Sequence, residues 1–129
     1  MIPQIYEFNT KLLNVKTGQV KTLEKAEFDW LLGALFEEID ELREAYDKNQ
    51  IVDAVDALID LSYFAIGGLV RMGLTQEQME VCFSAIHQAN MNKKSGVKET
   101  RPQDGSIADA VKPANWEAPE EQIKRILGQ

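Results

Sequence analysis

The sequence predicts an all-α protein, a bundle of four or five helices followed by an extended C-terminal tail. Apolar residues recur at spacings of three and four over about 2–94, no strand pattern stands out, and Gly, Pro, Ser and Asp gather after residue 94. The 129 residues suit one domain. We therefore expect a single domain over 1–129, with its helical core at about 2–94 and an irregular tail at about 95–129.

Two long helices are predicted after a short amphipathic helix over residues 2–13. The first covers about 22–48 and the second covers 50–71, with Asn49 as the boundary residue. Each carries one apolar stripe with a helical repeat. The stripe residues are Phe28, Leu31, Leu32, Leu35, Ile39 and Leu42 on the first helix, and Val52, Val55, Ile59, Ser62, Ile66 and Leu69 on the second. Gly67-Gly68 is interpreted either as a place where another helix approaches closely or as a weak point near the helix end.

A third long helix is predicted over 76–92, and a last short one from Pro119 to Leu127. Gly73 is expected to stop the preceding helix, and Thr75 and Gln78 have the spacing of a capping box. The expected buried side of the third helix consists of Met79, Cys82, Phe83 and Ile86. A thiol on that side is expected to be packed rather than reactive.

Composition excludes several classes of function. The formal charge is −7, from 21 acidic and 14 basic residues, which argues against a nucleic-acid partner. The lone His87 excludes sites that need two imidazoles, including most catalytic zinc sites. A single cysteine allows no internal disulfide, and no apolar run is long enough for a membrane span. We expect an acidic, soluble, cytoplasmic protein with no membrane partner.

Acidic residues are concentrated between residues 37 and 60, where nine carboxylates face only two basic side chains, Arg43 and Lys48. At about 100° per residue, six of these carboxylates flank the apolar stripe on the two long helices. Consecutive helices joined by a short connection pack antiparallel, so the two acidic lines are expected to meet. The residues of these lines are Glu37, Glu38 and Glu41 on the first helix, and Asp53, Asp56 and Asp60 on the second.

Carboxylates that face one another repel unless they are protonated or neutralised. Oxygen ligands without histidine or thiolate favour hard divalent ions such as Mg²⁺, and Mn²⁺ is also acceptable. The alternative is that these are ordinary surface charges paired with lysine or arginine. A di-iron bundle is excluded because the sequence has no Glu-x-x-His.

Four segments of the sequence have the form of known motifs. Residues 37–42 read E-E-x-x-E-L, and residues 56–63 read D-A-L-x-D-L-x-Y. Residues 87–93 read H-x-x-N-M-x-K, and residues 111–119 contain K-P…W…P. In this order the four segments resemble those of the all-α nucleotide pyrophosphohydrolases of the MazG-like and HisE-like group, the second in its phage-type form. The resemblance covers most of the chain and implies a MazG-like helical bundle.

The resemblance implies an enzyme that hydrolyses a nucleoside triphosphate to the monophosphate and pyrophosphate with two or three Mg²⁺ ions. It implies a homodimer or homotetramer with sites built partly by neighbouring subunits. The phage-type form suggests a nucleotide-pool enzyme, with a slight preference for a purine such as (d)GTP. Phosphoribosyl-ATP and dUTP or dCTP are alternative substrates. An alternative of another class is a non-catalytic bundle that binds divalent ions or a protein.

The resemblance also assigns roles to the acidic residues. Glu38, Glu41 and Asp60 are the first expected metal ligands, and Glu37 and Asp56 follow. One of Glu37 and Glu38 is expected to orient or deprotonate the attacking water, because a tuned carboxylate acts as a base at neutral pH. Ala57 stands where the family usually has glutamate, so Asp56 or Asp53 would have to supply the missing oxygen. Asp40, Glu44 and Asp47 are expected to be solvated.

Asn90 and Lys93 are the expected substrate-binding residues. Asn90 continues the buried stripe of the third helix, where a polar side chain needs a partner: either a neighbouring backbone group or the substrate. Lys93 suits a phosphate, although a surface lysine at a helix C-terminus is the alternative. Trp30 and Trp116 are expected in the core or an interface, with stacking on a base as the alternative.

Overall fold

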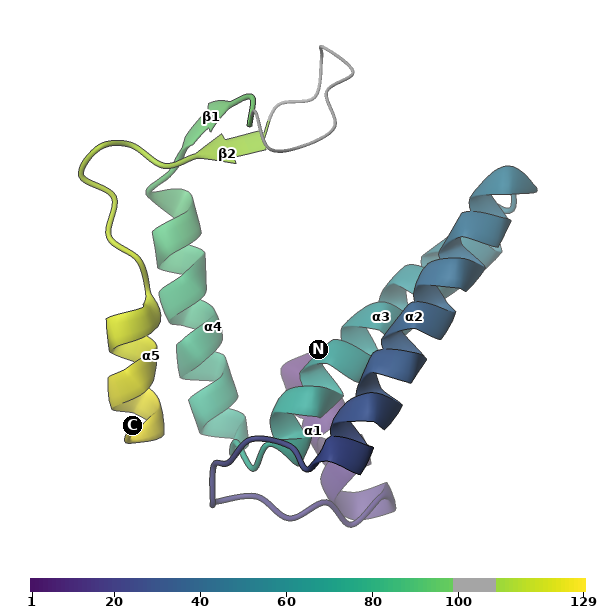
Figure 1. The fold of residues 1–129 in the computed structure, drawn as a ribbon, viewed down its shortest axis with the longest axis horizontal. Coiled ribbons are helices and arrows are strands. Elements are labelled where there is room, and N and C mark those ends of the chain that lie inside the picture. The colour runs from purple at the N-terminus through teal and green to yellow at the C-terminus, as the bar shows by residue number, and fades with distance from the viewer. Residues whose placement is uncertain (99–108) are drawn as a thin grey trace. The chain divides into compact units, whose positions relative to one another are not determined.

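The computed structural model describes residues 1–98 and 109–129 (Figure 1). Its elements are α1 (Ile2–Glu7), the π-helix η1 (Phe8–Leu12), α2 (Lys25–Asp47), α3 (Ile51–Arg71), α4 (Gln76–Met91), β1 (Lys94–Gly96), β2 (Asp109–Val111) and α5 (Glu120–Leu127). The all-α class is confirmed, and each predicted helix ends within three residues of its expected bounds. No helix in the described ranges has the length and apolar character to cross a bilayer.

The chain divides inside α4 into a first unit, residues 1–79, and a second unit, residues 80–129. The expected single domain over 1–129 stays a prediction.

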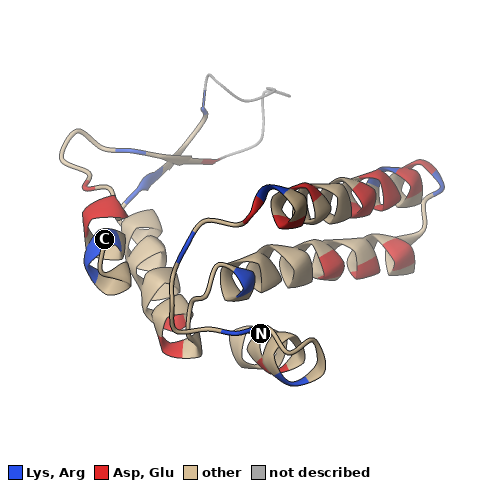
Figure 2. Ribbon diagram, turned by 60° about the horizontal axis from the view of Figure 1, so that its bottom comes forward, with Lys and Arg blue, Asp and Glu red and all other residues tan. Residues whose placement is uncertain are grey.

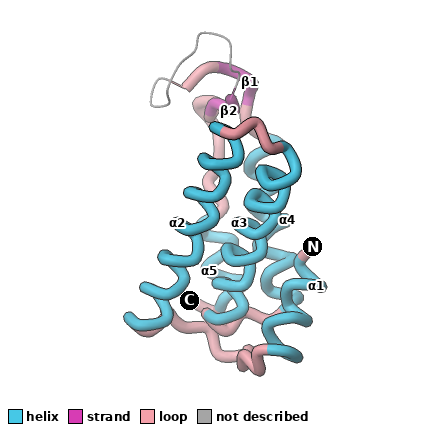
Figure 3. The backbone as a smooth tube through the Cα atoms, turned by 90° about the vertical axis from the view of Figure 1, so that its right-hand side faces the viewer, coloured by secondary structure: helices cyan, strands magenta, loops and turns pink. Residues whose placement is uncertain are grey.

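In the first unit, α2 and α3 pack along each other (Figure 3). Asn49 turns the chain between them with φ of 54°, a left-handed conformation that asparagine tolerates better than most residues. Near the other end of the pair, a Cβ on Gly68 would lie 2.8 Å from Leu31 Cδ2, and one on Gly67 would lie 3.2 Å from Asn9 Nδ2. The glycine pair therefore allows two neighbours to approach α3, which confirms the close-approach interpretation.

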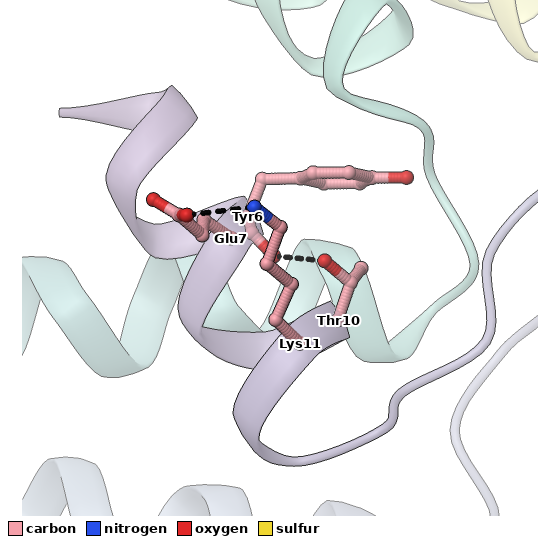
Figure 4. Close-up of polar contacts among 4 residues, drawn as sticks. All are labelled: Tyr6, Glu7, Thr10 and Lys11. Atoms are coloured by element: carbon pink, nitrogen blue, oxygen red, sulfur yellow. Dashed lines mark hydrogen bonds and ion pairs between the residues drawn. The ribbon is translucent and has the colours of Figure 1, made fainter.

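The predicted helix over 2–13 changes at Phe8 from an α-helix to the π-helix η1. Thr10 Oγ1 donates to the Tyr6 carbonyl at 2.8 Å, and Lys11 Nζ donates to Glu7 Oε1 at 2.9 Å (Figure 4). The Asn9 side chain is buried, and its Nδ2 donates to the Ile5 carbonyl at 2.9 Å. The wider turn thus accommodates a buried amide beside the space that Gly67 leaves.

The end of α3 is fixed by the loop that precedes α2. Gly18 N–H donates to the Gly73 carbonyl at 2.8 Å, and Lys21 N–H donates to the Met72 carbonyl at 2.9 Å. Gly73 has φ of +93°, and a Cβ there would lie 2.0 Å from the Gln19 carbonyl oxygen, so only glycine fits this predicted stop.

The predicted capping box at the start of α4 is also present. Thr75 N–H donates to Gln78 Oε1 at 3.0 Å, and Gln78 N–H donates to Thr75 Oγ1 at 3.2 Å. These two bonds satisfy backbone donors that have no partner within the helix.

In the second unit, two short strands correct the expectation that the chain has none. β1 and β2 pair antiparallel with Lys94 opposite Val111 and Gly96 opposite Asp109. Strands of three residues are too short to show a clear alternation of apolar and polar residues. The rest of the predicted tail contains α5, and its part at residues 99–108 lies outside the described residues.

The structure corrects the expected burial of the apolar stripes. On α4, Met79 and Cys82 are buried as predicted, but Phe83 is 59% and Ile86 41% exposed, and Ala85 and Ala89 are buried instead. Burial raises the pKa of the Cys82 thiol, in keeping with a packed and unreactive group. Several stripe residues of α2 and α3 are also exposed: Phe28, Leu32, Ile39, Val52, Val55, Ile59 and Leu69. Periodicity shows which face is apolar and does not show what covers it.

Candidate active site

The net negative charge of the chain lies in the first unit. Residues 1–79 carry 14 acidic and seven basic side chains, and residues 80–129 carry seven of each. Figure 2 shows the acidic residues distributed along α2 and α3. The first unit therefore bears the whole formal charge of −7.

Glu38 is the most constrained of these acidic residues. It is 8% exposed, and its Oε2 atom is buried without a hydrogen-bond partner. Burial is the largest cause of a raised pKa at Glu38, followed by the negative charges of Glu41 and Asp60, a side-chain hydrogen bond with Glu41 and, more weakly, the negative charge of Glu37. Carboxylates from both long helices therefore lie within electrostatic reach of one buried oxygen.

An acidic cleft of about 450 Å³ lies beside this group, at the end of α2 and the start of α3. Glu41 is common to both, because it raises the pKa of Glu38 and also lines the cleft. The lining residues are Glu41, Glu44, Ala45, Lys48, Gln50, Asp53 and Asp56.

Position 57 carries no oxygen for this site. The Ala57 side chain is completely buried, whereas Asp53 and Asp56 both line the acidic cleft. Both candidates for the missing oxygen are thus present in the cleft, and the choice between them stays a prediction.

The carboxylate oxygens of Glu38, Glu41 and Asp60 are the type of ligand that suits a hard divalent cation. No three acidic, histidine or cysteine side chains within residues 1–98 and 109–129 converge closely enough to enclose one ion. An unpaired buried carboxylate oxygen is nevertheless costly, and like charges beside it add to that cost. A divalent ion bound by Glu38, Glu41 and Asp60 would offset both.

The second unit holds the two expected substrate-binding residues. The expected burial of Asn90 was wrong, because this residue is exposed on α4. Its Oδ1 accepts a hydrogen bond from Lys93 Nζ at 2.8 Å. Lys93 Nζ also lies 5.2 Å from the centroid of the Trp116 ring, and Trp116 Nε1 donates to the Ala89 carbonyl at 2.6 Å. The binding of substrate by Asn90 and Lys93 stays a prediction.

Trp30 lines a separate aromatic pocket of about 170 Å³ in the first unit. Its ring is 47% exposed and meets Phe64 edge-on, and the Arg71 guanidinium lies 4.3 Å from its centroid. Arg71 also pairs with Glu27 at 3.2 Å. Stacking of Trp30 on a base stays a prediction. The pocket is lined by Phe8, Asn9, Leu13, Trp30, Tyr63, Phe64, Gly67 and Arg71.

A comparison with protein families supplies the identification. The model of the phosphoribosyl-ATP pyrophosphohydrolase family matches residues 6–90, which include both acidic segments. The chain belongs to this family. This family is part of the MazG-like all-α nucleotide pyrophosphohydrolase superfamily, so the chain is a hydrolase acting on phosphoric anhydrides. The family typically depends on a divalent metal, and no curated protein matches the chain significantly.

Three polar residues line the acidic cleft of this pyrophosphohydrolase in addition to those expected at the site: Glu44, Lys48 and Gln50. The Glu44 side chain is 63% exposed, so its expected solvation is confirmed. Glu44 and Lys48 form an ion pair, which lowers the pKa of Glu44 and raises that of Lys48. The i, i+4 spacing of Glu44 and Lys48 is the sequence feature from which this ion pair could have been predicted. Asp40 is exposed, which confirms its predicted solvation, and it pairs with Arg43 at 3.1 Å.

The first prediction concerns the stability of the metal-free enzyme. Glu38→Gln removes a buried charge at constant size, so we expect a higher melting temperature at pH 7, by about 4 °C for each ~1 kcal/mol gained. A carboxyl with a raised pKa in the folded state destabilises the fold as pH rises above its ordinary pKa. The difference from wild type should therefore vanish near pH 4.

The measurement is thermal unfolding followed by circular dichroism in metal-free buffer, with and without added Mg²⁺. Asp40→Asn, which removes an exposed carboxylate on the same helix, is the matched control and should change little. Mg²⁺ should stabilise the wild type and the control more than Glu38→Gln. A lower melting temperature for metal-free Glu38→Gln would contradict the prediction.

Proposed function

We propose that the enzyme hydrolyses a nucleoside triphosphate to the monophosphate and pyrophosphate, with a slight preference for a purine such as (d)GTP. The observation that carries the proposal is the buried, unpaired Glu38 oxygen among carboxylates of both long helices. The D-A-L-x-D form at residues 56–60 supports a nucleotide-pool substrate. We place the enzyme in the cytoplasm, which keeps a lone cysteine reduced.

Glu38, Glu41 and Asp60 are proposed to hold Mg²⁺, in two or three ions, with Glu37 and Asp56 as further ligands; Mn²⁺ is an alternative ion. When bound, these ions supply positive charge for the phosphates and lower the pKa of a bound water. One of Glu37 and Glu38 is proposed instead to orient or deprotonate the attacking water, a role that a carboxylate plays at neutral pH when its surroundings tune its pKa.

Asn90 and Lys93 are proposed to bind the substrate. The Lys93 ammonium offers a point charge to a phosphate oxygen. Its hydrogen bond to Asn90 holds the ammonium in place, which lowers the entropy lost when the phosphate binds.

Phosphoribosyl-ATP is the second candidate substrate, because the matching family is described by its hydrolysis. Its hydrolysis also breaks a phosphoric anhydride and releases pyrophosphate, so the same metal-binding carboxylates serve either substrate. The family match favours both of these activities over a non-catalytic bundle that binds ions or a protein.

The second prediction is a substrate ranking. Pyrophosphate release is measured for GTP, dGTP, dATP, dUTP, dCTP and phosphoribosyl-ATP at one concentration with Mg²⁺. We expect a purine triphosphate to have the highest kcat/KM; a higher value for phosphoribosyl-ATP would support the second candidate instead.

The same assay tests the metal ligands. Glu41→Gln should lower kcat/KM by about 100-fold or more, because even the loss of an outer partner of a metal ligand costs ~10–100-fold. Asp40→Asn, one residue away but paired with Arg43, is the matched control and should keep wild-type activity. Equal activities for the two variants would contradict the metal assignment.

The chain is proposed to work as a homodimer or homotetramer. The pairing of α2 with α3 leaves many large apolar side chains of both helices exposed, including members of their apolar stripes. A contiguous exposed apolar surface marks an interface, and a second copy is its simplest complement. The exposed residues include Phe28, Leu32, Phe36 and Ile39 of α2, and Val55, Leu58 and Ile59 of α3.

The third prediction is the mass in solution. Size-exclusion chromatography with light scattering should give two or four times 14.6 kDa. Phe36→Glu, at a side chain 62% exposed, should shift the mass toward the monomer, because it places a charge on the apolar surface of α2. Leu12→Glu, in η1 and 66% exposed, is the control for a charge elsewhere. A monomeric wild type would contradict the prediction.

A further inference from the structure

Two lysines of the second unit lie within cation–π distance of one indole ring, that of Trp116. Lys93 Nζ lies 5.2 Å and Lys112 Nζ lies 4.7 Å from the centroid of the Trp116 ring. The two nitrogens therefore cannot be more than about 10 Å apart. Each ammonium gains only a modest cation–π attraction from the ring, while the two positive charges repel each other.

The hairpin register accounts for this meeting. Lys94 pairs with Val111 in the antiparallel ladder of β1 and β2. Lys93 directly precedes β1 and Lys112 directly follows β2, so the hairpin brings both lysines to the same end of the ladder. Two positive charges held near each other repel, and a shared anion would offset that repulsion.

Trp116 is held in place as a platform for both lysines. Its indole N–H donates to the Ala89 carbonyl at 2.6 Å, in the last turn of α4, where carbonyls lack partners within the helix. Its backbone N–H donates to the Pro113 carbonyl at 3.1 Å. Lys93 is held a second time by its hydrogen bond to Asn90 Oδ1 at 2.8 Å.

Neither lysine has a carboxylate within ion-pair distance in the described part of the chain. Four other lysines do: Lys11, Lys25, Lys48 and Lys124. Lys112 is exposed and Lys93 half-buried, so both ammonium groups can be reached from solvent. Two oriented cations without a counter-anion are the chemistry of an anion-binding site.

We propose that Lys93 and Lys112, positioned by Trp116, form a clamp for a polyphosphate anion. Two separate ammonium groups match an anion whose charge is spread over two or more phosphates. Lys112 contacts the anion together with Lys93, and Trp116 acts as a positioning residue. The choice of polyphosphate rests on the proposed function, whereas the clamp itself rests on the geometry of the second unit.

The fourth prediction uses inorganic pyrophosphate as the probe and the full chain as the protein. Binding is measured by calorimetry at low ionic strength, in buffer freed of metal by a chelating resin. Lys112→Gln should weaken binding by about tenfold or more, the loss typical of a charged hydrogen bond. Lys112→Arg keeps the charge and should restore most of the affinity. Lys124→Gln removes a lysine that is already paired with Glu121, and should bind like wild type.

Two further readouts separate binding from structure. Lys112→Gln should raise KM for the nucleotide about as much as it weakens pyrophosphate binding, with kcat changed by less than about threefold. Trp116→Phe keeps a ring but loses the N–H that donates to Ala89, and should weaken pyrophosphate binding as well. Circular dichroism melting checks that each variant is folded. If Lys112→Gln is less stable than wild type, the pyrophosphate affinity of Lys112→Arg distinguishes the loss of the charge from the loss of structure.

The clamp and the proposed function fail separately. Lys112-dependent binding of pyrophosphate without any nucleotide hydrolysis would support the clamp and overturn the function. Hydrolysis with unchanged pyrophosphate affinity and unchanged KM in Lys112→Gln would overturn the clamp and leave the function standing.

Discussion

The central feature of the acidic region is one buried carboxylate oxygen, which belongs to Glu38. Glu38 Oε2 has no hydrogen-bond donor and lies within reach of like charges from Glu41 and Asp60. An uncompensated buried carboxylate is costly in any fold, and a divalent cation removes the cost and at the same time attracts phosphates. The first unit carries the whole formal charge of −7, and a divalent cation would lower the repulsion that a phosphoric anhydride meets there.

The packing of α2 against α3 brings Glu41 and Asp60 within electrostatic reach of Glu38. Close packing at Gly68 and Leu31 holds α2 against α3 at one end, and the left-handed Asn49 closes the pair at the other. The second unit supplies the opposite chemistry, since Lys93 and Lys112 converge on Trp116 without carboxylate partners in the described residues. One unit is thus suited to metal ions and the other to phosphate oxygens.

Sequence periodicity predicted the helices because their apolar repeats are long, and it predicted the approach of Glu38 to Asp60 because consecutive helices pack antiparallel. It missed features set by tertiary contacts. Asn90 lies at the right spacing for burial, but the neighbouring alanines face inward instead. The meeting of Lys93 and Lys112 depends on a hairpin register that three-residue strands do not encode visibly.

The most direct test is a crystal structure with Mn²⁺ and a nucleotide whose α–β bridge is non-hydrolysable. We predict anomalous peaks for bound ions beside carboxylate oxygens of Glu38, Glu41 and Asp60, at roughly the 2.0–2.2 Å typical of small divalent ions. Those three side chains pointing apart into solvent, with the ions and nucleotide elsewhere, would contradict the central claim.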